Sequence, residues 1–352
     1  MKGHAMQTAT MTSKSLRVLT RDTHLTRLVI ILITLFLFFA IVKTEGFLNL
    51  RTWQSMAIQF PEFGLMALGV MLTMITGGID LSVVGIANMT SIGAAVVMLS
   101  LVPRGAEPGQ VFLGISAAIV LALVGGAVAG VVNGLLVAKV RIPAILATLG
   151  TFELFTGVAI LITGGKPKSG LPPAFGQVFA GKVFGIVPVP LIVFVITAII
   201  VGLIMTRTAY GTKLYMLGTN ARAAEFSGLN TTSLLIRTYV FSGLTASLGG
   251  LVMLANYNSA KADYGSTYTL LTVLIVVLGG VNPNGGSGRL LGVVLAILIL
   301  QILSSGLNMF PSISNFYRPL IWGGVLLAVI ATNQMSRSRS LLRRFTRKGQ
   351  SS

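Results

Sequence analysis

Two acidic residues lie inside otherwise apolar stretches of the chain, where a carboxylate could bind a solute or a proton. Asp80 stands in the motif GGIDLSVVG, residues 77–85, and Glu153 comes two residues after the run ATLGT. A charge in lipid is costly, so we expect both carboxylates to face protein or water. Two interpretations of Asp80 stay open. It caps the helix that follows, because Asp is a favoured N-cap residue, or it belongs to a hinge or gate of a transport path.

Other polar residues accompany these acids within the apolar segments. Asn88 and Asn133 lie in predicted spans, and Glu62 follows Pro61 near the outer end of another. Each could bind a hydroxyl-rich solute or simply hydrogen-bond a neighbouring helix, and Glu62 could also reach the membrane interface. The candidate gate or pathway residues are Gly77, Gly78, Asp80, Ser82, Asn88 and Glu153.

The residue types needed for catalysis or metal binding are scarce. The chain has no Cys, and its two His, His4 and His24, lie in the N-terminal segment. The Gly-rich stretch LGGVNPNGGSGRLLG, residues 278–292, contains turn dipeptides but lacks the Lys-Ser or Lys-Thr pair of a nucleotide-binding P-loop. We therefore predict no catalytic residue, no metal site and no cofactor bound by this chain. The stretch itself is interpreted as a broken helix or a tight turn.

The elements that must hold these residues are predicted to be membrane-spanning helices. Hydrophobic residues make up 54% of the 352 positions and charged residues 10%, against about 25% charged in soluble domains. The apolar runs are uniform rather than alternating, which favours helices over a barrel. The sequence thus predicts an all-α polytopic membrane protein with about ten transmembrane helices. The candidate spans are 28–43, 56–76, 83–101, 111–138, 144–165, 188–206, 234–256, 268–281, 290–309 and 317–333.

Lysine and arginine residues set the orientation of these helices. With the N-terminus inside, 18 of the 26 Lys and Arg fall on the inner side, as the positive-inside rule expects. The same distribution accounts for the net charge of +18 without nucleic acid. We predict that both termini are cytoplasmic (N-in/C-in), with a basic segment at 1–27 and a basic tail at 334–352. Between them, a transmembrane domain at 28–333 contains a cytoplasmic loop at 207–233.

Glycines recur at four-residue spacing in the fourth apolar run. Gly126, Gly130 and Gly134 would form a ridge that lets two helix backbones approach closely. Packing within one chain is the favoured interpretation, and a contact between two chains is the alternative.

The cytoplasmic loop is predicted to contain a short helix. Asn220 can cap its start, the alanines that follow favour helix, and Gly228 suits its end. Arg222 and Glu225 are three residues apart and can pair on one face. Because two turns of helix are marginal alone, we expect this helix to dock on a cytoplasmic partner. A solvated connector is the alternative.

Four ordered motifs make the chain resemble permease subunits of the ribose/xylose/galactose group of ABC importers. They are GGIDLSVVG (77–85), NGLLVAKVRIPAILATLGT (133–151), YGTKLYMLGTNARAAEFSGL (210–229) and LGGVNPNGGSGRLLG (278–292), and the resemblance covers roughly 50–335. Residues 259–280 are most similar to one subunit of autoinducer-2 importers. The chain departs from the family pattern at Val84, where the family usually has Gly, and at Arg222 and Glu225, whose charges are swapped.

The resemblance implies a type II ABC importer permease of the bacterial inner membrane that moves a sugar or sugar-like molecule into the cytoplasm. Its implied partners are cytoplasmic ATPase subunits, which use the ATP, a periplasmic binding protein, a second permease chain and membrane lipid. The residues implied to couple the chain to the ATPases are Gly218, Asn220, Arg222, Ala223, Ala224, Glu225 and Gly228. The alternative function is an ion-coupled secondary transporter, whose ion or proton site would lie inside the membrane.

Overall fold

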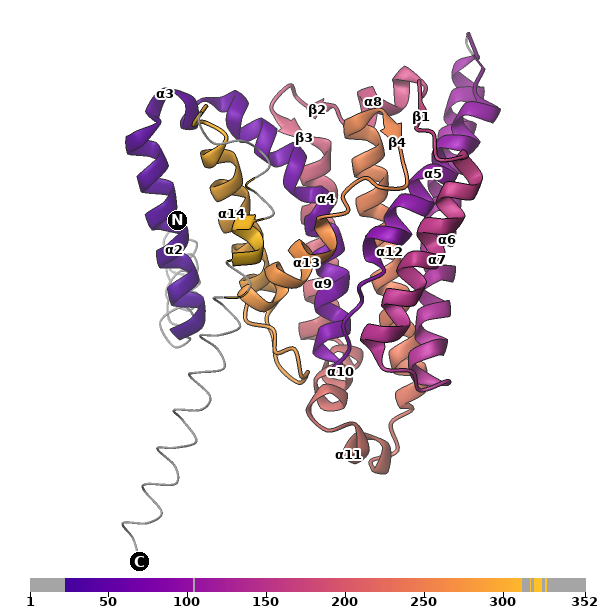
Figure 1. Ribbon diagram of the computed structural model, residues 1–352, viewed down its shortest axis with the longest axis vertical. Coiled ribbons are helices and arrows are strands. Elements are labelled where there is room, and N and C mark those ends of the chain that lie inside the picture. Colours follow the sequence, from indigo (N-terminus) through magenta and orange to yellow (C-terminus); the bar gives the residue numbers. More distant parts are fainter. Residues whose placement is uncertain (1–22, 104, 312–316, 318–319, 325–326, 328–352) are drawn as a thin grey trace, which may run out of the picture.

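Long apolar helices dominate the computed structural model of the protein, which describes residues 23–103, 105–311, 317, 320–324 and 327 (Figure 1). Within these residues, eight helices are long and apolar enough to cross a membrane. They are α2 (Thr23–Val42), α4 (Leu50–Ile75), α5 (Val83–Leu101), α6 (Pro108–Ala138), α7 (Ala144–Thr163), α9 (Val189–Arg207), α12 (Thr231–Tyr257) and α14 (Leu290–Leu307). The predicted all-α polytopic class is confirmed.

The predicted number of ten spans needs a correction. The run at 268–281 forms α13 (Tyr268–Leu278), which has only 11 residues. At 1.5 Å per residue this helix is roughly 16 Å long, too short for a hydrocarbon core of about 30 Å. The Gly-rich stretch after it breaks the chain before α14 begins, as the turn dipeptides predicted. Most of the run at 317–333, the segment 1–22 and the tail 334–352 lie outside the described residues.

The short elements divide between the two ends of the bundle (Figure 1). At one end lie α10 (Ala209–Thr219) and α11 (Ala221–Phe226), near the last turns of α6 and α9 and the first turns of α12. At the other end lie α3 (Thr44–Phe47) and α8 (Pro173–Phe179) with two small antiparallel sheets. One sheet pairs β1 (Lys168–Ser169) with β4 (Ser259–Ala260), and the other pairs β2 (Lys182–Val183) with β3 (Val187–Pro188). The excess of cations counted over the whole sequence predicts that the α10–α11 end is the cytoplasmic end.

Helices α4 and α12 form the centre of the bundle, and α6 packs closely on α12. The glycine ridge makes this close approach possible: an added Cβ at Gly130 would overlap the Tyr239 carbonyl oxygen, and one at Gly134 would lie 2.6 Å from the Ile236 Cα. Gly126 likewise faces Gly243 and Ser247 of α12. The ridge therefore packs within one chain, as the favoured interpretation predicted.

Candidate functional site

Asp80 lies in the loop between α4 and α5, in a polar network sealed from solvent. Its side chain is 0% exposed. One carboxylate oxygen, Oδ1, accepts hydrogen bonds from the Ser82 backbone N–H (3.0 Å) and the Ser82 hydroxyl (2.6 Å). The other, Oδ2, accepts one from the Ser242 hydroxyl of α12 at 2.7 Å. Asp80 therefore faces protein, as expected for a carboxylate at this depth.

The same network extends to two more helices. Asn133 of α6 donates its amide to the Ser82 hydroxyl at 2.7 Å, and Thr151 of α7 donates to the Asn133 side-chain oxygen at 2.6 Å. Asn133 thus makes interhelical hydrogen bonds, which was the favoured of its two interpretations. Because the chain of bonds joins α5, α6, α7 and α12, a change in the position of any one helix would break at least one of them.

The capping interpretation of Asp80 is wrong in one respect. Helix α5 begins at Val83, and its N-cap residue is Ser82, which makes no side-chain capping bond. Asp80 instead accepts hydrogen bonds from Ser82, the residue at the N-cap position. The hydrogen bonds of its carboxylate connect the α4–α5 loop to the start of α5 and to α12.

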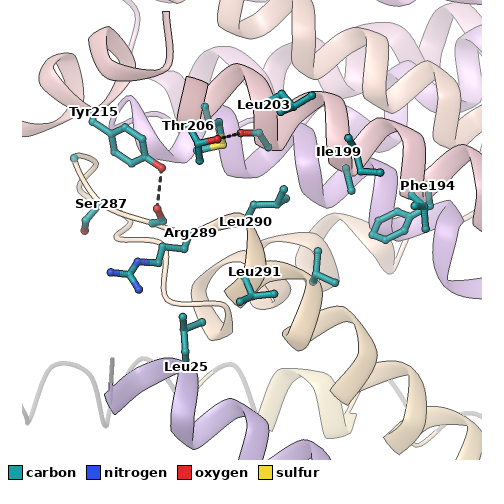
Figure 2. A pocket seen from close by; sticks show the side chains of 17 residues that line it. Leu25, Phe194, Ile199, Leu203, Thr206, Tyr215, Ser287, Arg289, Leu290 and Leu291 are labelled. Carbon is teal, nitrogen blue, oxygen red and sulfur yellow. Dashed lines mark hydrogen bonds between the residues drawn. The ribbon is translucent and has the colours of Figure 1, made fainter. Parts of the chain in front are cut away.

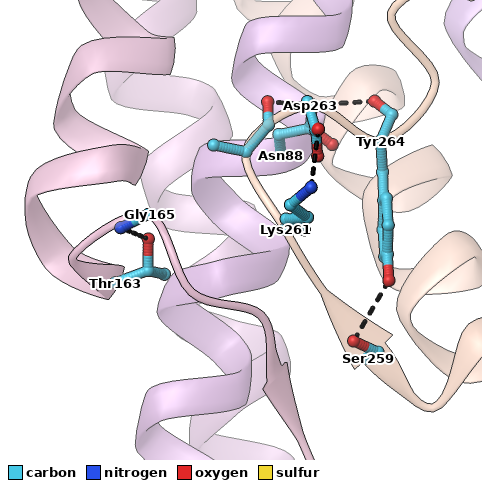
Figure 3. Close-up of polar contacts among 8 residues, drawn as sticks. Asn88, Thr163, Gly165, Ser259, Lys261, Asp263 and Tyr264 are labelled. Carbon is cyan, nitrogen blue, oxygen red and sulfur yellow. Dashed lines mark hydrogen bonds and ion pairs between the residues drawn. The ribbon is translucent and has the colours of Figure 1, made fainter.

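Asn88 is also buried, and it holds a loop near the end of the bundle opposite α10 and α11 (Figure 3). Its amide donates to the backbone carbonyls of Ala262 and Tyr264, each at 2.8 Å. In the same loop, Lys261 pairs with Asp263 at 2.8 Å on the surface, and this hydrogen bond raises the pKa of Lys261. Asn88 therefore links α5 to the segment that joins α12 and α13.

Glu153 differs from the other polar candidates, Asp80, Ser82 and Asn88, because it is exposed. It is the tenth residue of the 20-residue helix α7, so it lies near the middle of a membrane-length segment. Gly150 and Gly157, on the same side of the helix, have open space where a Cβ would be. A carboxylate facing hydrocarbon at this depth would cost several kcal/mol. This face of α7 is therefore unsuited to contact with lipid.

A second buried carboxylate cluster was not predicted. Glu62 of α4 is 2% exposed, so its carboxylate is enclosed by protein. It accepts hydrogen bonds from the Asn256 amide (2.8 Å), the Tyr257 hydroxyl (2.8 Å) and the Tyr268 hydroxyl (3.2 Å). These donors come from the end of α12 and the start of α13. Neither tyrosine stands out in the sequence, because only the fold brings both to Glu62.

The short helix predicted in the cytoplasmic loop is present as α11. The Asn220 side chain accepts a hydrogen bond from the Ala223 backbone N–H at 3.0 Å, which caps the helix start. Gly228 follows the helix end with a φ of +79°, a conformation that favours glycine. Helix α10 precedes it and completes a helical pair that projects from the end of the bundle (Figure 1).

Two details of this helix differ from expectation. Arg222 and Glu225 are both exposed and form no ion pair, although both are among the described residues. Ala224 is only 3% exposed because it packs against the core of its own chain. The side chain that does project is Phe226, which is 92% exposed. A large aromatic residue at the end of a polar helix was a usable signal that the sequence reasoning missed.

Backbone contacts connect this helical pair to the loop that carries Asp80. The Gly286 N–H donates to the Ile75 carbonyl oxygen at 2.9 Å. Gly218, inside α10, lies against both groups, and an added Cβ there would overlap them. Gly285 lies against Gly77 in the same way, with a Cβ position 2.8 Å from the Gly77 nitrogen. We call this meeting of α10, the α4–α5 loop and the Gly-rich stretch the glycine junction.

Two other predicted residues, Gly78 and Ala223, differ in their exposure. Gly78 is buried beside Tyr239, whose hydroxyl would lie 2.8 Å from an added Cβ. Ala223 is exposed on α11. No group of three or more His, Cys, Asp or Glu side chains able to hold a metal ion is found in the part of the chain that the structure describes.

Comparisons with known proteins identify relatives that match most of the chain. The family model described as "Branched-chain amino acid transport system / permease component" matches residues 53–330. The ribose import permease protein RbsC of Bacillus subtilis (strain 168) is 33% identical over 268 residues, 76% of this chain and 80% of that protein. The autoinducer 2 import system permease protein LsrD of Yersinia enterocolitica is 31% identical over 289 residues, 80% of this chain and 83% of that protein.

A solved structure has the same fold. The chain is similar to a metal-chelate type ABC transporter in an inward-facing conformation, with a TM-score of 0.51 and 14% identity. The likeness covers 87% of this chain and 98% of that one. The resemblance seen in the four motifs is confirmed. The chain belongs to this permease family, and it is a multi-pass membrane protein that serves a bacterial ABC importer as a transport subunit rather than an enzyme.

Proposed function

We propose that the chain imports a sugar or a sugar-like small molecule, driven by separate cytoplasmic ATPases and fed by a periplasmic binding protein. The observation that carries this proposal is the helical pair α10–α11, capped at Asn220 and held at the cytoplasmic end with Phe226 exposed. A large exposed aromatic side chain on a rigid element is a typical anchor for a partner protein. The coupling residues therefore divide into those that shape the helix, such as Asn220, Ala224 and Gly228, and those that face the partner, such as Arg222, Ala223 and Glu225.

The substrate class follows the relatives. Two of them are named as permeases for ribose and for autoinducer 2, and both match three quarters or more of this chain. The family description names branched-chain amino acids, whereas the names of these two relatives specify other solutes. We therefore favour a small hydroxyl-rich solute.

The transport path lies along the exposed face of α7, where a second permease chain faces it. Glu153 supports this placement, since its carboxylate needs water or protein around it in mid-membrane. Gly150 and Gly157 leave room for a close approach by another helix or for solute. Asp80 and Ser82 act indirectly, because they hold the loop between the glycine junction and the helices that pack against α7.

Accessibility to a water-soluble reagent tests this path. The chain has no Cys, so a single Glu153→Cys change in the assembled complex gives one reactive thiol. We expect a charged thiol reagent to label it. Ile33→Cys is a matched control, because Ile33 is 51% exposed near the middle of α2 and is expected to face lipid. If Glu153→Cys and Ile33→Cys are equally protected from the reagent, the transport path does not run along α7.

Reconstitution tests the function itself. The chain is purified with its co-eluting partners and placed in vesicles, and uptake of labelled D-ribose and of autoinducer 2 is measured. We expect uptake of one of them to require both ATP and the binding protein, and the binding protein to stimulate ATP hydrolysis. Uptake driven by a proton or sodium gradient without ATP would refute the proposal and support the secondary-transporter alternative.

A further inference from the structure

The chain turns back into the bundle between β4 and α13 (Figure 1). Strand β4 lies at the end of the bundle opposite α10 and α11, whereas α13 lies near the middle. Residues 261–267, which join these two elements, form neither helix nor strand. We call residues 261–267 the re-entrant segment.

Two contacts give the depth of the re-entrant segment. The Asn88 amide of α5 donates to two backbone carbonyls of this segment. The residue before Asn88, Ala87, packs so closely on Gly250 of α12 that an added Cβ on the glycine would overlap the Ala87 carbonyl oxygen. From Gly250 to its end at Tyr257, α12 rises about 10 Å at 1.5 Å per residue. The segment therefore reaches roughly 10 Å below the end of a membrane-length helix.

The re-entrant segment exposes polar groups at this depth. The Asp263 side chain is 63% exposed, and Ser266 and Thr267 are exposed as well. Neither hydroxyl makes a hydrogen bond within the described residues, although Thr267 is the N-cap residue of α13. Irregular backbone inside a membrane is tolerated only where it is buried in protein or lines water. This surface therefore faces water, a solute or another protein chain rather than lipid.

Buried polar atoms without a partner lie around the same segment. In the described part of the chain, the side-chain oxygen of Asn88, a residue that is 1% exposed, has no hydrogen-bond partner. The same holds for the side-chain oxygens of Asn256, near the end of α12, and of Thr269, in the first turn of α13. Buried polar atoms in proteins are nearly always hydrogen-bonded. A guest with several hydroxyl groups can supply the donors that these oxygens lack.

We infer that the re-entrant segment is a binding subsite for the hydroxyl groups of the transported solute. The inference rests on the proposed function, which supplies the solute class. Ser266 and Thr267 offer unpaired hydroxyls, and Asp263 offers an exposed carboxylate. A second permease chain would bury these groups permanently, at the cost of desolvating them. A solute leaves them in water between transport cycles.

The subsite is continuous in depth with the proposed path along α7. Phe152 of α7 packs against Gly85, which precedes Asn88 by less than one turn of α5. Glu153, the next residue of α7, therefore lies within about 5 Å of the height of Asn88. The mid-membrane carboxylate and the re-entrant segment thus occupy the same level of the bundle.

The groove between α9 and α14 is a poorer match for a hydroxyl-rich solute (Figure 2). Most of its lining is apolar and includes Ile199 and Leu203 of α9 and Leu291 of α14. The Tyr215 hydroxyl at its edge already donates to the Gly288 carbonyl oxygen at 2.9 Å. The re-entrant segment, by contrast, presents hydroxyls that are unpaired.

Accessibility to a charged thiol reagent tests whether the segment faces water. The complex with Ser266→Cys is placed in lipid nanodiscs, where a charged methanethiosulfonate reaches both faces of the membrane. We expect Ser266→Cys to react about tenfold faster or more than Val120→Cys, because a charged reagent is excluded from hydrocarbon.

Val120→Cys is the matched control because it lies at the same depth on a lipid-facing helix. Val120 is 59% exposed on α6. Gly126 and Gly130 of α6 lie against Gly243 and Tyr239 of α12, so the two helices are antiparallel. Continuing this alignment toward the start of α6 places Val120 near the level of Gly250.

Removal of a hydroxyl tests whether the segment binds solute. Uptake of labelled D-ribose and of autoinducer 2 is measured in vesicles with saturating binding protein. We expect Ser266→Ala to lower uptake of the transported solute about fivefold, the effect of one hydrogen bond, while the binding protein still stimulates ATP hydrolysis. Ser100→Ala is the matched control, because Ser100 is an exposed serine of α5 outside the segment.

The outcomes separate this inference from the proposed function. Wild-type uptake together with equal protection of Ser266→Cys and Val120→Cys would overturn the inference and leave the proposed function standing, with a protein chain covering the segment. Equal uptake by Ser266→Ala and Ser100→Ala would overturn it as well. So would a parallel loss of uptake and ATP hydrolysis in Ser266→Ala, since a disturbed fold lowers both. A wild-type complex that takes up neither solute would refute the proposed function, and the inference with it.

Discussion

Replacing Gly218 with Ala would disturb the glycine junction at its most crowded point. The added methyl group would overlap the Ile75 carbonyl oxygen and the Gly286 nitrogen, both of which are backbone atoms that cannot rotate away. The methyl would also separate these two groups, whose hydrogen bond of 2.9 Å is worth about 0.5–1.5 kcal/mol. Overpacking adds about 1–3 kcal/mol, and the better helix propensity of Ala returns about 1 kcal/mol. A net destabilisation of roughly 0.5–3.5 kcal/mol remains for the junction.

The expected consequence is a loss of coupling rather than a loss of assembly. Phe226 and the capped helix α11 are untouched by the change, so the ATPases should still associate. ATP hydrolysis stimulated by the binding protein, and uptake, should both fall in reconstituted vesicles. Gly176→Ala is the matched control, because Gly176 lies in α8 at the opposite end of the bundle with open space at its Cβ position. If Gly218→Ala transports as well as Gly176→Ala and wild type, the junction does not transmit the signal.

Three further predictions concern single side chains. Asp80→Ala leaves two hydroxyls and one N–H without their buried acceptor, so it should lower the free energy of unfolding of the purified protein by about 3 kcal/mol or more. Asp80→Asn should lower it clearly less, and equal melting temperatures of the two variants would contradict this prediction. Phe226→Ala should weaken ATPase association by about 2 kcal/mol or more with stability unchanged, and normal pull-down of the ATPase would refute it. Glu62→Leu should destabilise the end of α12 at Tyr257 and so speed proteolysis after this residue. An unchanged rate of digestion would refute the stabilising role of the Glu62 hydrogen bonds.

Much of the fold was predictable because lipid imposes a simple rule on sequence. Apolar runs of about 20 residues became helices, whereas the orientation inferred from the cations stays a prediction. The break before α14 was also visible, in the Asn-Pro and Asn-Gly dipeptides. The length of α13 was overestimated, because the apolar run was extended to Val281 across Gly279 and Gly280, the glycine pair at which the helix ends.

The candidate site was predicted less completely, for a physical reason. Asp80 and Asn133 stand out because charged and amide groups are rare in spans, but their partners Ser242 and Thr151 look like ordinary small residues of a membrane helix. Ser and Thr can satisfy themselves on their own helix, so only the packing shows which of them bind a neighbour. The burial of Ala224 was not predictable for the same reason. The sequence of a short helix does not show which of its faces packs against the rest of the chain.

The contact between α11 and an ATPase subunit is the central claim, and a site-specific photo-crosslink measures it most directly. In this Cys-free chain, Ser227→Cys places one thiol next to Phe226 at the exposed end of α11, and a maleimide–benzophenone reagent is attached to it in the assembled complex. Lys182→Cys, exposed on β2 at the opposite end, carries the same reagent as the control. We predict that light produces an adduct of Ser227→Cys with the ATPase subunit and none with Lys182→Cys. No ATPase adduct at position 227, or an equal adduct at position 182, would contradict the account.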